Sequence, residues 1–316
     1  MKFLVSGSGG FIGSNVCKRL LSEGHEVVGV DNLNEYYSIK IKKDRISSLI
    51  LDSPLFTFRQ LDVAEIGLRK LAIGQNGFDF IIHLAAQAGV RHSVENPAAY
   101  VHSNLVGFQN MIELARKIRP INFVYASSSS VYGLNKPPFT EDMDIGQPAN
   151  LYAATKVSNE MVARSYGHMY GLENTGLRFF TVYGPDGRPD MLFNLAMEHI
   201  AKGKPLDLFW EEGATMLRDF TYVDDIVDGI IEATFKPEVN EVYNLCGGRC
   251  VSIERALDLI ESEMGKPLIR NYVGSVSGDI QETAGCLAKS KKRLGYAPGV
   301  GLEAGIKKMC EWYRSH

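Results

Sequence analysis

Short apolar runs alternate with longer stretches of helical periodicity up to about residue 181. The apolar runs predict strands over residues 2–6, 26–30, 55–59, 79–84, 121–127 and 174–181. Periodic apolar positions predict helices near residues 11–23, 40–51, 97–118 and 150–171. Buried strands that alternate with helices are typical of an α/β protein with a doubly wound parallel sheet. In such a sheet, ligands bind beyond the carboxyl ends of the strands.

This regular alternation ends near residue 182, where turn-rich segments begin. Residues 184–189 and 203–205 are rich in glycine and proline and precede isolated helical stretches. We therefore predict a first domain over residues 1–182 and a smaller C-terminal substrate domain over residues 183–316. Residues 220–245 again show a helix pattern followed by a strand pattern, and we expect them to rejoin the first domain.

The composition narrows the classes of partner. A chain of 316 residues can bury a substantial core. Its net charge of -3, with mixed signs, offers no basic face, so we expect no nucleic-acid partner. No apolar run approaches the ~20 residues that span a bilayer, and the N-terminus shows no signal-peptide pattern. We therefore expect a cytoplasmic protein that does not bind a membrane.

The cysteines and histidines do not form a metal motif. No histidine stands at ligand spacing from the close pair Cys246 and Cys250. We expect reduced structural thiols and no bound metal. The cysteines are Cys17, Cys246, Cys250, Cys286 and Cys310. The histidines predicted to be ordinary core or polar residues are His83, His92, His102, His168 and His199.

The first predicted strand runs directly into a glycine-rich turn over residues 7–13. Glycines let the backbone approach a pyrophosphate, which is attracted by the amides and dipole of the following helix. The second strand ends in Asp31, an acid that suits the ribose hydroxyls of NAD and repels the extra phosphate of NADP. An Asp that only caps the loop is the structural alternative. The predicted NAD contacts in this region are Gly7, Gly10, Phe11, Ile12, Gly13, Asp31 and Asn32.

A second motif, Tyr152-Ala-Ala-Thr-Lys156, follows the serine-rich segment 127–133. Residues four apart lie on one face of a helix, so the Lys156 ammonium can reach the region of the Tyr152 phenol. A nearby cation favours the phenolate of a tyrosine, whose ordinary pKa is about 10, and suits it to act as a general base. A serine hydroxyl from the preceding strand could share the substrate proton. The motif predicts hydride transfer from an alcohol, although the pair alone could be two unrelated surface residues.

Together these motifs resemble the extended short-chain dehydrogenases/reductases that modify nucleotide sugars, over almost the whole chain. Within that group the chain most resembles the UDP-glucuronate 4-epimerases. The closer resemblance is carried by residues 31–37, 83–93, 104–107, 178–185, 187–191 and 218–225. The resemblance implies a Rossmann-type sheet, bound NAD, a UDP-sugar substrate and a homodimer.

The resemblance also implies a mechanism. Tyr152 takes the proton of the sugar 4-hydroxyl while the hydride at that carbon passes to NAD. The 4-keto sugar then rotates about its link to the nucleotide, and the same NADH returns the hydride to the other face of the sugar. Lys156 lowers the phenol pKa and holds the nicotinamide ribose, and Ser128 shares the proton. The further cofactor contacts that the resemblance implies are Asp62 and Val63 near the adenine, and Leu84, Ala85, Ala86 and Asn104 along the diphosphate and ribose.

The residues after the fifth strand distinguish among these relatives. Dehydrating and decarboxylating relatives carry Asp-Glu or a lone Glu where this chain has Ser129 and Ser130. Without that acid, returning the hydride unchanged is favoured. A 4-ketouronate is a β-keto acid that loses carbon dioxide easily, so its carboxylate must be held, and hydroxyls can do this without a new ionised neighbour. The candidates are Ser128, Ser129, Ser130 and Thr181, with Arg188 as a charge-assisted contact.

The nucleotide half is less well marked. Relatives for neutral sugars usually have Asn at the position of Thr181, and Arg218 matches the family's diphosphate-binding arginine. Asp279 is a candidate for the second phosphate or the uridine ribose, although Ser277 stands where the family has proline. The role of Arg91 stays open. Thr181 could instead be an ordinary strand-end residue, Arg188 a solvated loop charge and Arg218 a helix cap.

The leading prediction is conversion of UDP-glucuronate to UDP-galacturonate. Three alternatives stay open: a 4-epimerase for a neutral sugar such as UDP-glucose or UDP-N-acetylglucosamine, a UDP-glucuronate decarboxylase, and a non-catalytic protein that senses NAD. Helices 97–118 and 150–171 each have an apolar face that could form a dimer seam or pack on the sheet.

Overall fold

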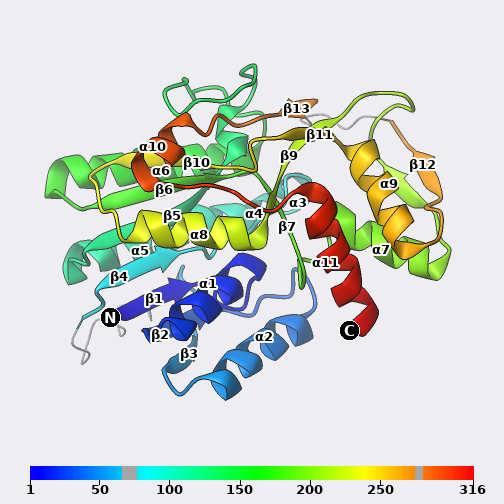
Figure 1. Cartoon of the computed structure of the whole chain (residues 1–316). Helices are drawn as coiled ribbons and strands as arrows, with labels where there is room; N and C mark the ends of the chain where they lie inside the picture. The colour runs from blue at the N-terminus through cyan, green and yellow to red at the C-terminus, as the bar shows by residue number, and fades with distance from the viewer. Residues whose placement is uncertain (66–76, 275–279) are drawn as a thin grey trace.

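The computed structural model describes residues 1–65, 77–274 and 280–316. Within these residues, seven parallel strands form one large sheet in the order β10-β6-β5-β4-β1-β2-β3 (Figure 1). The predicted doubly wound α/β sheet is confirmed. The strands are β1 (Lys2–Ser6), β2 (Glu26–Asp31), β3 (Phe56–Gln60), β4 (Phe80–His83), β5 (Asn122–Ser128), β6 (Asn174–Phe179) and β10 (Glu241–Leu245).

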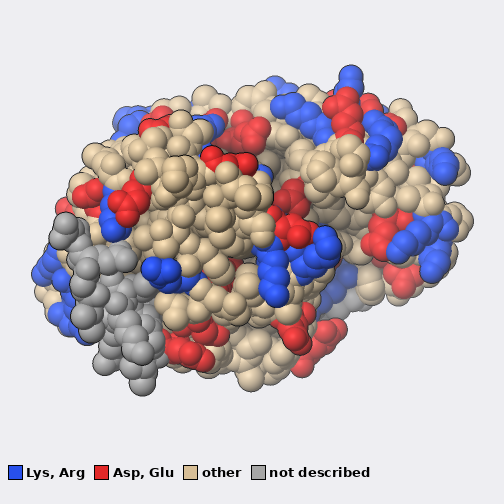
Figure 2. Space-filling view, turned by 90° about the horizontal axis from the view of Figure 1, so that it is seen from below, with Lys and Arg blue, Asp and Glu red and all other residues tan. Residues whose placement is uncertain are grey.

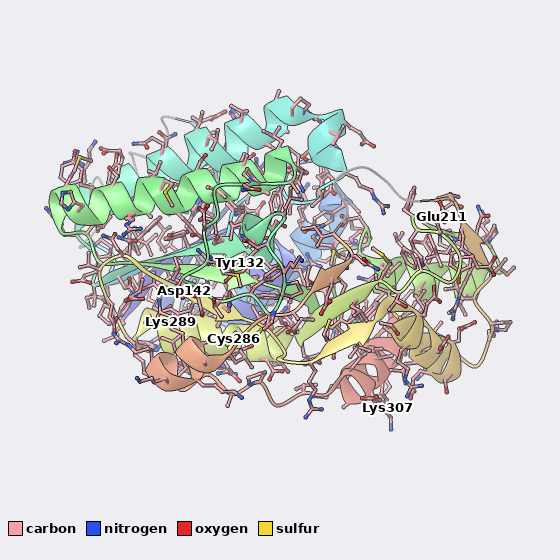
Figure 3. All side chains as sticks on the ribbon, turned by 90° about the horizontal axis from the view of Figure 1, so that it is seen from above. Tyr132, Asp142, Glu211, Cys286, Lys289 and Lys307 are labelled. Carbon is pink, nitrogen blue, oxygen red and sulfur yellow. The ribbon has the colours of Figure 1, made fainter. Side chains whose placement is uncertain are left out.

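Alternating side chains of β1 explain the layers on either side of the sheet. Phe3 and Val5 enter the core that the sheet shares with α1 (Phe11–Ser22) and α8 (Val223–Thr234). Leu4 points to the opposite core, under α5 (Gly107–Ile118) and α6 (Leu151–Tyr170). Figure 1 shows α1, α2 (Ile39–Asp52) and α8 on the near face of the sheet. Figure 3 shows α5 and α6 side by side along the other.

The order of the strands positions a ligand site. From β1 the chain moves outward through β2 and β3 and then returns to β4, which pairs with the other edge of β1. The side on which successive strands are added to the sheet therefore switches between β1 and β4, and a ligand crevice is expected beyond the carboxyl ends of these strands. Strand β10 pairs with β6 in register from Glu241↔Thr175 to Leu245↔Phe179. The division of the chain at residue 182 stays a prediction.

Most of the remaining elements build a smaller lobe beside this sheet, at the right of Figure 1, whereas α10 (Ala288–Leu294) packs against β10 and α8. Strand β9 pairs with β7, β11 and β13, and β8 pairs with β12. The strands are β7 (Thr181–Tyr183), β8 (Leu206–Leu208), β9 (Leu217–Tyr222), β11 (Cys250–Ser252), β12 (Arg270–Tyr272) and β13 (Glu282–Thr283). The helices after residue 182, apart from α8, are α7 (Leu192–Lys202), α9 (Ile253–Met264), α10 (Ala288–Leu294) and α11 (Leu302–Ser315).

The predicted helix 97–118 is interrupted. Short helices α3 (His92–Glu95) and α4 (Pro97–Tyr100) lead into a π-helical turn, η2 (Val101–Val106), before α5 begins. The carbonyl of Asn104 in this turn accepts a hydrogen bond at 3.0 Å from Nδ2 of Asn159, a residue of α6. Such π turns occur often at functional sites.

The predicted strand 174–181 is divided in two. Strand β6 ends at Phe179, and the amide of Phe180 donates to the carbonyl of Leu245 at 3.2 Å. Thr181 then begins β7, which pairs with β9 of the smaller lobe instead of continuing in the large sheet. The chain thus changes sheets at Phe180, directly beside the ligand crevice.

Candidate active site

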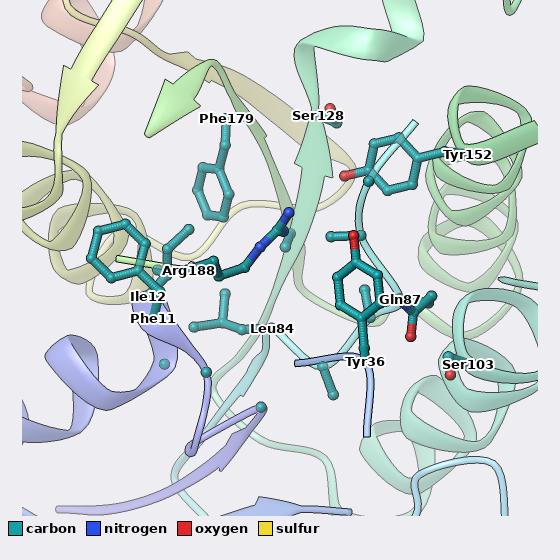
Figure 4. A pocket seen from close by; sticks show the side chains of 18 of the residues that line it. Phe11, Ile12, Tyr36, Leu84, Gln87, Ser103, Ser128, Tyr152, Phe179 and Arg188 are labelled. Atoms are coloured by element: carbon teal, nitrogen blue, oxygen red, sulfur yellow. The ribbon is translucent and has the colours of Figure 1, made fainter. Parts of the chain in front are cut away.

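A cavity of about 420 Å³ lies at the carboxyl ends of the strands, where Figure 4 shows its lining. Turned to the view from below, the face in Figure 2 is hollowed between the larger body and the smaller lobe, with acidic and basic side chains interspersed. Most of the predicted site residues line this one cavity. They are Gly7, Gly10, Phe11, Ile12, Gly13, Asp31, Asn32, Asp62, Val63, Leu84, Ala85, Ala86, Ser128, Ser129, Ser130, Tyr152, Lys156, Thr181 and Arg188.

The glycine turn packs too closely for side chains. A Cβ atom on Gly7, whose φ is +76°, would lie 2.8 Å from the amide nitrogen of Ala85. A Cβ on Gly13 would lie 2.0 Å from the Gly7 carbonyl oxygen. Gly10 is the N-cap of α1, and within the described residues no side chain caps this helix start. The exposed first amides and this close approach of the backbone fit a dinucleotide pyrophosphate.

Asp31 ends β2 at the edge of the same turn. Its carboxylate accepts hydrogen bonds from the amides of Gly9 at 3.0 Å and Leu33 at 2.8 Å. A carboxylate offers about four acceptor positions, so capacity for ribose hydroxyls is left after these two bonds. Asp31 therefore caps its loop and also lines the cavity, so the loop-capping role and the predicted role as a ribose contact are compatible.

Asp62, predicted to lie near the adenine, lines one part of the cavity. Burial opposes its ionisation, but hydrogen bonds from Asn32 Nδ2 at 2.9 Å and the Ala64 amide at 2.8 Å outweigh burial and lower the pKa of this carboxyl. The two loops that follow β2 and β3 are thereby joined. Val63 is buried next to this pair.

Asn104 stands behind the described lining, not in it. Its side chain accepts from the Gln87 amide at 2.8 Å and donates to the Gln87 carbonyl at 3.0 Å. It also donates to Thr155 Oγ1 at 3.0 Å. Asn104 thus fixes the wall formed after β4, and a direct contact of Asn104 with a cofactor stays a prediction.

Tyr152 sits in the first turn of α6. The helix begins here because the Asn150 side chain caps it, accepting from the Ala153 amide at 2.9 Å. Figure 4 shows the phenol oxygen of Tyr152 directed into the cavity. Burial raises the pKa of Tyr152, while the hydroxyl of Ser128 and the charge of Arg188 act to lower it. The proposed base is therefore protonated at neutral pH in this structure.

Lys156 lies one turn further along α6 and is 4% exposed. Its Nζ donates to the Ala126 carbonyl at 2.8 Å and lies 5.9 Å from the centre of the Tyr152 ring. Burial lowers the pKa of Lys156 to about 8, an effect that the charge of Glu160 partly offsets. The ammonium form therefore still dominates at pH 7.

A buried ion pair that the sequence analysis missed lies beneath this motif. Glu160 accepts from Arg178 Nε at 2.9 Å and Nη2 at 2.8 Å, and from Ser127 Oγ at 2.5 Å. The side chains of Arg178 and Glu160 are 3% and 4% exposed. The pair ties α6 to β5 and β6 under Lys156. A glutamate four residues after Lys156 was the available signal, because that spacing places both on one helix face.

The predicted carboxylate-holding hydroxyls meet on one side of the cavity. Ser128 ends β5, and its Oγ accepts from the Ser130 amide at 3.1 Å, which starts the 3₁₀ turn η3 (Ser129–Tyr132). Thr181 begins β7 and lines the same cavity. Segment 127–133 contains neither Asp nor Glu, so the turn adds hydroxyls without a negative charge.

Arg188 reaches into the cavity between Phe179, Tyr36 and Tyr152 (Figure 4). Its Nε and Nη2 pair with Asp190 at 3.0 and 2.7 Å. Burial disfavours the charge, but Asp190 outweighs it and raises the pKa of Arg188. The Tyr36 hydroxyl donates to the same carboxylate at 3.0 Å. Tyr36 and Asp190 were not predicted as site residues, although both lie in segments that carried the family resemblance.

Arg91 and Arg218, two other predicted substrate contacts, are not among the residues that line this cavity. The Arg91 guanidinium stacks on the Phe209 ring, 3.7 Å from its centre. Arg218 donates to the carbonyls of Leu217 at 2.8 Å and Gln281 at 3.1 Å. Asp279 lies outside the described residues. Contacts of these three residues with a nucleotide stay predictions.

The described residues contain neither a metal-binding cluster nor a membrane-spanning helix. Over residues 1–65, 77–274 and 280–316, no three His, Cys, Asp or Glu side chains are grouped so that they could hold a metal ion. None of the helices described in those ranges is long and apolar enough to cross a bilayer. All five cysteines are free thiols.

Comparison with known proteins identifies the family. A sequence profile of the NAD dependent epimerase/dehydratase family matches residues 3–246. The chain belongs to this family. Among its members, the probable UDP-glucuronate 4-epimerase of Rhizobium meliloti is 39% identical, with 99% of this chain and 97% of that protein covered. The UDP-glucuronate 4-epimerase of Thermodesulfobacterium geofontis is 40% identical, over 99% and 96%.

Solved structures of epimerase/dehydratase family members superpose closely. The UDP-glucuronic acid 4-epimerase of Bacillus cereus, solved with UDP-glucuronic acid and NAD, matches with a TM-score of 0.93 and 34% identity, covering 100% of this chain and 99% of that one. The UDP-glucose 4-epimerase of Thermotoga maritima, solved with UDP-glucose, matches with a TM-score of 0.88 and 30% identity, over 100% and 99%. Because epimerases named for charged and neutral sugars share this fold, the cavity residues must distinguish the substrate.

Proposed function

We propose that this protein is an NAD-dependent UDP-glucuronate 4-epimerase that interconverts UDP-glucuronate and UDP-galacturonate. The observation that carries the proposal is the cavity itself, where Tyr152 faces both Arg188 and the uncharged hydroxyl turn after β5. The named relatives from R. meliloti and T. geofontis support the same substrate. NAD, when bound along the glycine turn and Asp31, supplies a group that accepts and returns a hydride.

Tyr152 acts as the general base and acid at the sugar 4-hydroxyl. Its phenol is half-buried and needs help to ionise, because this burial raises the pKa of Tyr152. The Ser128 hydroxyl and the charge of Arg188 supply that help in this structure, and the Lys156 ammonium lies on the same helix face. After the hydride is returned, Tyr152 gives the proton back to the sugar oxygen, so the reaction leaves the protein unchanged.

Arg188 and the hydroxyls hold the sugar carboxylate. A guanidinium has five N–H donors, of which Asp190 engages those on Nε and Nη2. The remaining donors can bind a carboxylate while Asp190 keeps the arginine fixed. Thr181, Ser129 and Ser130 add neutral donors. Holding the carboxylate near the plane of the 4-keto group disfavours loss of carbon dioxide while the sugar turns.

The test is turnover of defined UDP-sugars followed by chromatography and mass spectrometry. UDP-glucuronate carrying deuterium at C4 is expected to give UDP-galacturonate of unchanged mass, with the deuterium retained. A product lighter by carbon dioxide would instead identify a decarboxylase. Turnover of UDP-glucose or UDP-N-acetylglucosamine alone would show that Thr181 and Arg188 do not select a carboxylate.

The second part of the proposal is a homodimer formed through α5 and α6. Val101 and Val106, in the π turn before α5, are 43% and 44% exposed, and Met161 of α6 is 47% exposed. Burying such side chains against a second copy would remove apolar surface from water. Light scattering on the wild type is expected to give twice the monomer mass, and Met161→Lys is expected to shift it toward the monomer. A monomeric wild type would contradict this part alone.

A further inference from the structure

The loop that carries Arg188 is fastened to helix α2 by a buried ion pair. The side chain of Arg45 is 2% exposed, and its Nε donates to Asp186 Oδ2 at 2.8 Å. Its Nη2 donates to Asp186 Oδ1 at 3.1 Å and also to the Asp186 carbonyl. Its Nη1 donates to the Gly9 carbonyl at 3.2 Å. One arginine therefore joins the glycine turn to a residue two positions before Arg188.

The backbone of this loop needs an external hold. Asp186 has φ +54°, in the left-handed region that residues with a Cβ seldom adopt. The bonds from Arg45 engage both the carboxylate and the carbonyl of this residue, so they fix the unusual conformation from two sides. Burial opposes the charge on Arg45, and Asp186 outweighs it and raises the pKa of the guanidinium. The guanidinium of Arg45 is therefore charged.

A second fastening comes from the loop after β2. The Tyr36 hydroxyl donates to Asp190 Oδ2 at 3.0 Å, and the same oxygen accepts a hydrogen bond from Arg188 Nη2 at 2.7 Å. Tyr36 is itself confined. The ring of His92 lies 4.8 Å from its ring, and its hydroxyl stands 2.6 Å from where a Cβ on Gly89 would be. Arg45 and Tyr36 both belong to the segment between β2 and β3, and each donates a hydrogen bond to a residue of the segment 186–190.

We propose that Arg45 and Tyr36 are positioning residues for Arg188 and that they set the preference of the site for a sugar carboxylate over a hydroxymethyl group. The inference rests on the proposed function, because that function gives Arg188 a carboxylate to bind. A guanidinium binds a carboxylate through two parallel bonds only when both groups are aligned. A small displacement of Arg188 therefore weakens binding of a uronate and leaves the neutral sugar almost unaffected.

The test measures discrimination by calorimetry on the NAD-loaded protein. Dissociation constants for UDP-glucuronate, UDP-glucose and UDP are compared in wild type, Tyr36→Phe and Arg45→Lys. Lysine keeps the charge of Arg45 but lacks its fork of donors. The preference for UDP-glucuronate over UDP-glucose is expected to fall about tenfold in each variant, the scale of one charge-assisted hydrogen bond, with UDP binding unchanged. The matched control is K40Q/D44N, which removes an exposed ion pair on the same helix.

Two further measurements separate positioning from general damage. In an Arg188→Ala background, Arg45→Lys is expected to change the preference no further, because its effect passes through Arg188. Thermal unfolding by circular dichroism monitors the fold. Tyr36→Phe removes one oxygen, so it decides the question if Arg45→Lys does not fold. Two outcomes would overturn this inference alone, provided that the wild type epimerises UDP-glucuronate. One is an unchanged preference in Tyr36→Phe. The other is an effect of Arg45→Lys that adds to the effect of Arg188→Ala. A wild type that neither binds nor epimerises UDP-glucuronate would overturn the proposed function as well.

Discussion

Replacing Lys156 with methionine is expected to make the folded protein more stable at neutral pH, although it removes a group proposed for catalysis. Lys156 is 4% exposed, and its Nζ donates to the Ala126 carbonyl at 2.8 Å. Burial lowers its pKa from 10.5 to about 8, and the charge of Glu160 only partly offsets this. The folded protein therefore carries a positive charge at pH 7 in surroundings that disfavour it.

The size of the effect follows from the proton balance. Between pH 8 and 10.5 the unfolded chain keeps the Lys156 proton and the folded chain releases it, so stability rises with pH across this window. Each tenfold change in acidity is worth about 1.4 kcal/mol, so the charge costs the folded state about 3 kcal/mol at pH 7 and about 1 kcal/mol at pH 10. Methionine removes this cost because it fills similar space without charge. Losing the hydrogen bond to Ala126 lowers the free energy of unfolding by the same amount at every pH.

Urea unfolding at pH 7 and pH 10 is the assay. The stability of Lys156→Met relative to wild type is expected to be about 2 kcal/mol more favourable at pH 7 than at pH 10. Comparing the two pH values within each protein cancels the titration of groups that both share. The control is Lys40→Met, because that side chain is 83% exposed and should show little pH-dependent difference. A difference that is equal at both pH values, or larger at pH 10, would refute the burial argument.

Three other substitutions test other parts of the site. Glu160→Gln leaves the buried Arg178 without its counterion and should lower the free energy of unfolding by about 3–5 kcal/mol in urea; an unchanged midpoint would contradict a stabilising role of the pair. Tyr152→Phe should lower kcat roughly 10²- to 10⁴-fold while the Kd for UDP-glucuronate changes little, and a loss confined to binding would argue against a base. Gly13→Ala places a Cβ 2.0 Å from the Gly7 carbonyl and should reduce the NAD released from purified protein on acid treatment; a full complement of NAD would contradict the assigned cradle.

The sequence predicted the large sheet well because its signals are local. Each strand and helix predicted up to residue 179 is found within one or two residues of its predicted ends, apart from the π turn that interrupts 97–118. The short helix α3 and the 3₁₀ turn η3 were not predicted. The sequence of the smaller lobe shows no comparable alternation of strand and helix patterns. Strand β8 has three residues and pairs with β12, from Leu206↔Arg270 to Leu208↔Tyr272. Three residues are too few to show periodicity, and the pairing depends on residues 64 positions apart.

The candidate site likewise contains motifs that are local in sequence and contacts between residues far apart in sequence. The glycine turn and the pair Tyr152 and Lys156 are recognisable because each is built from residues close in sequence. The contacts that hold Arg188 are not. Tyr36 and Asp190 are 154 positions apart, and Arg45 and Asp186 are 141 positions apart. A single sequence shows that these residues are polar but does not show which of them meet.

The absence of acids from the turn after β5 has two effects on the proposed reaction. In this structure the charge of Arg188 acts to lower the pKa of the Tyr152 phenol, although burial has the larger effect and the pKa is raised. A sugar carboxylate bound to Arg188 would add a negative charge nearby and oppose that help. A glutamate at Ser129 or Ser130 would raise the pKa of the Tyr152 phenol further and make the base harder to ionise. Hydroxyls at these positions therefore both hold the carboxylate and spare the ionisation of Tyr152, which explains why a site for a charged sugar keeps neutral donors beside its base.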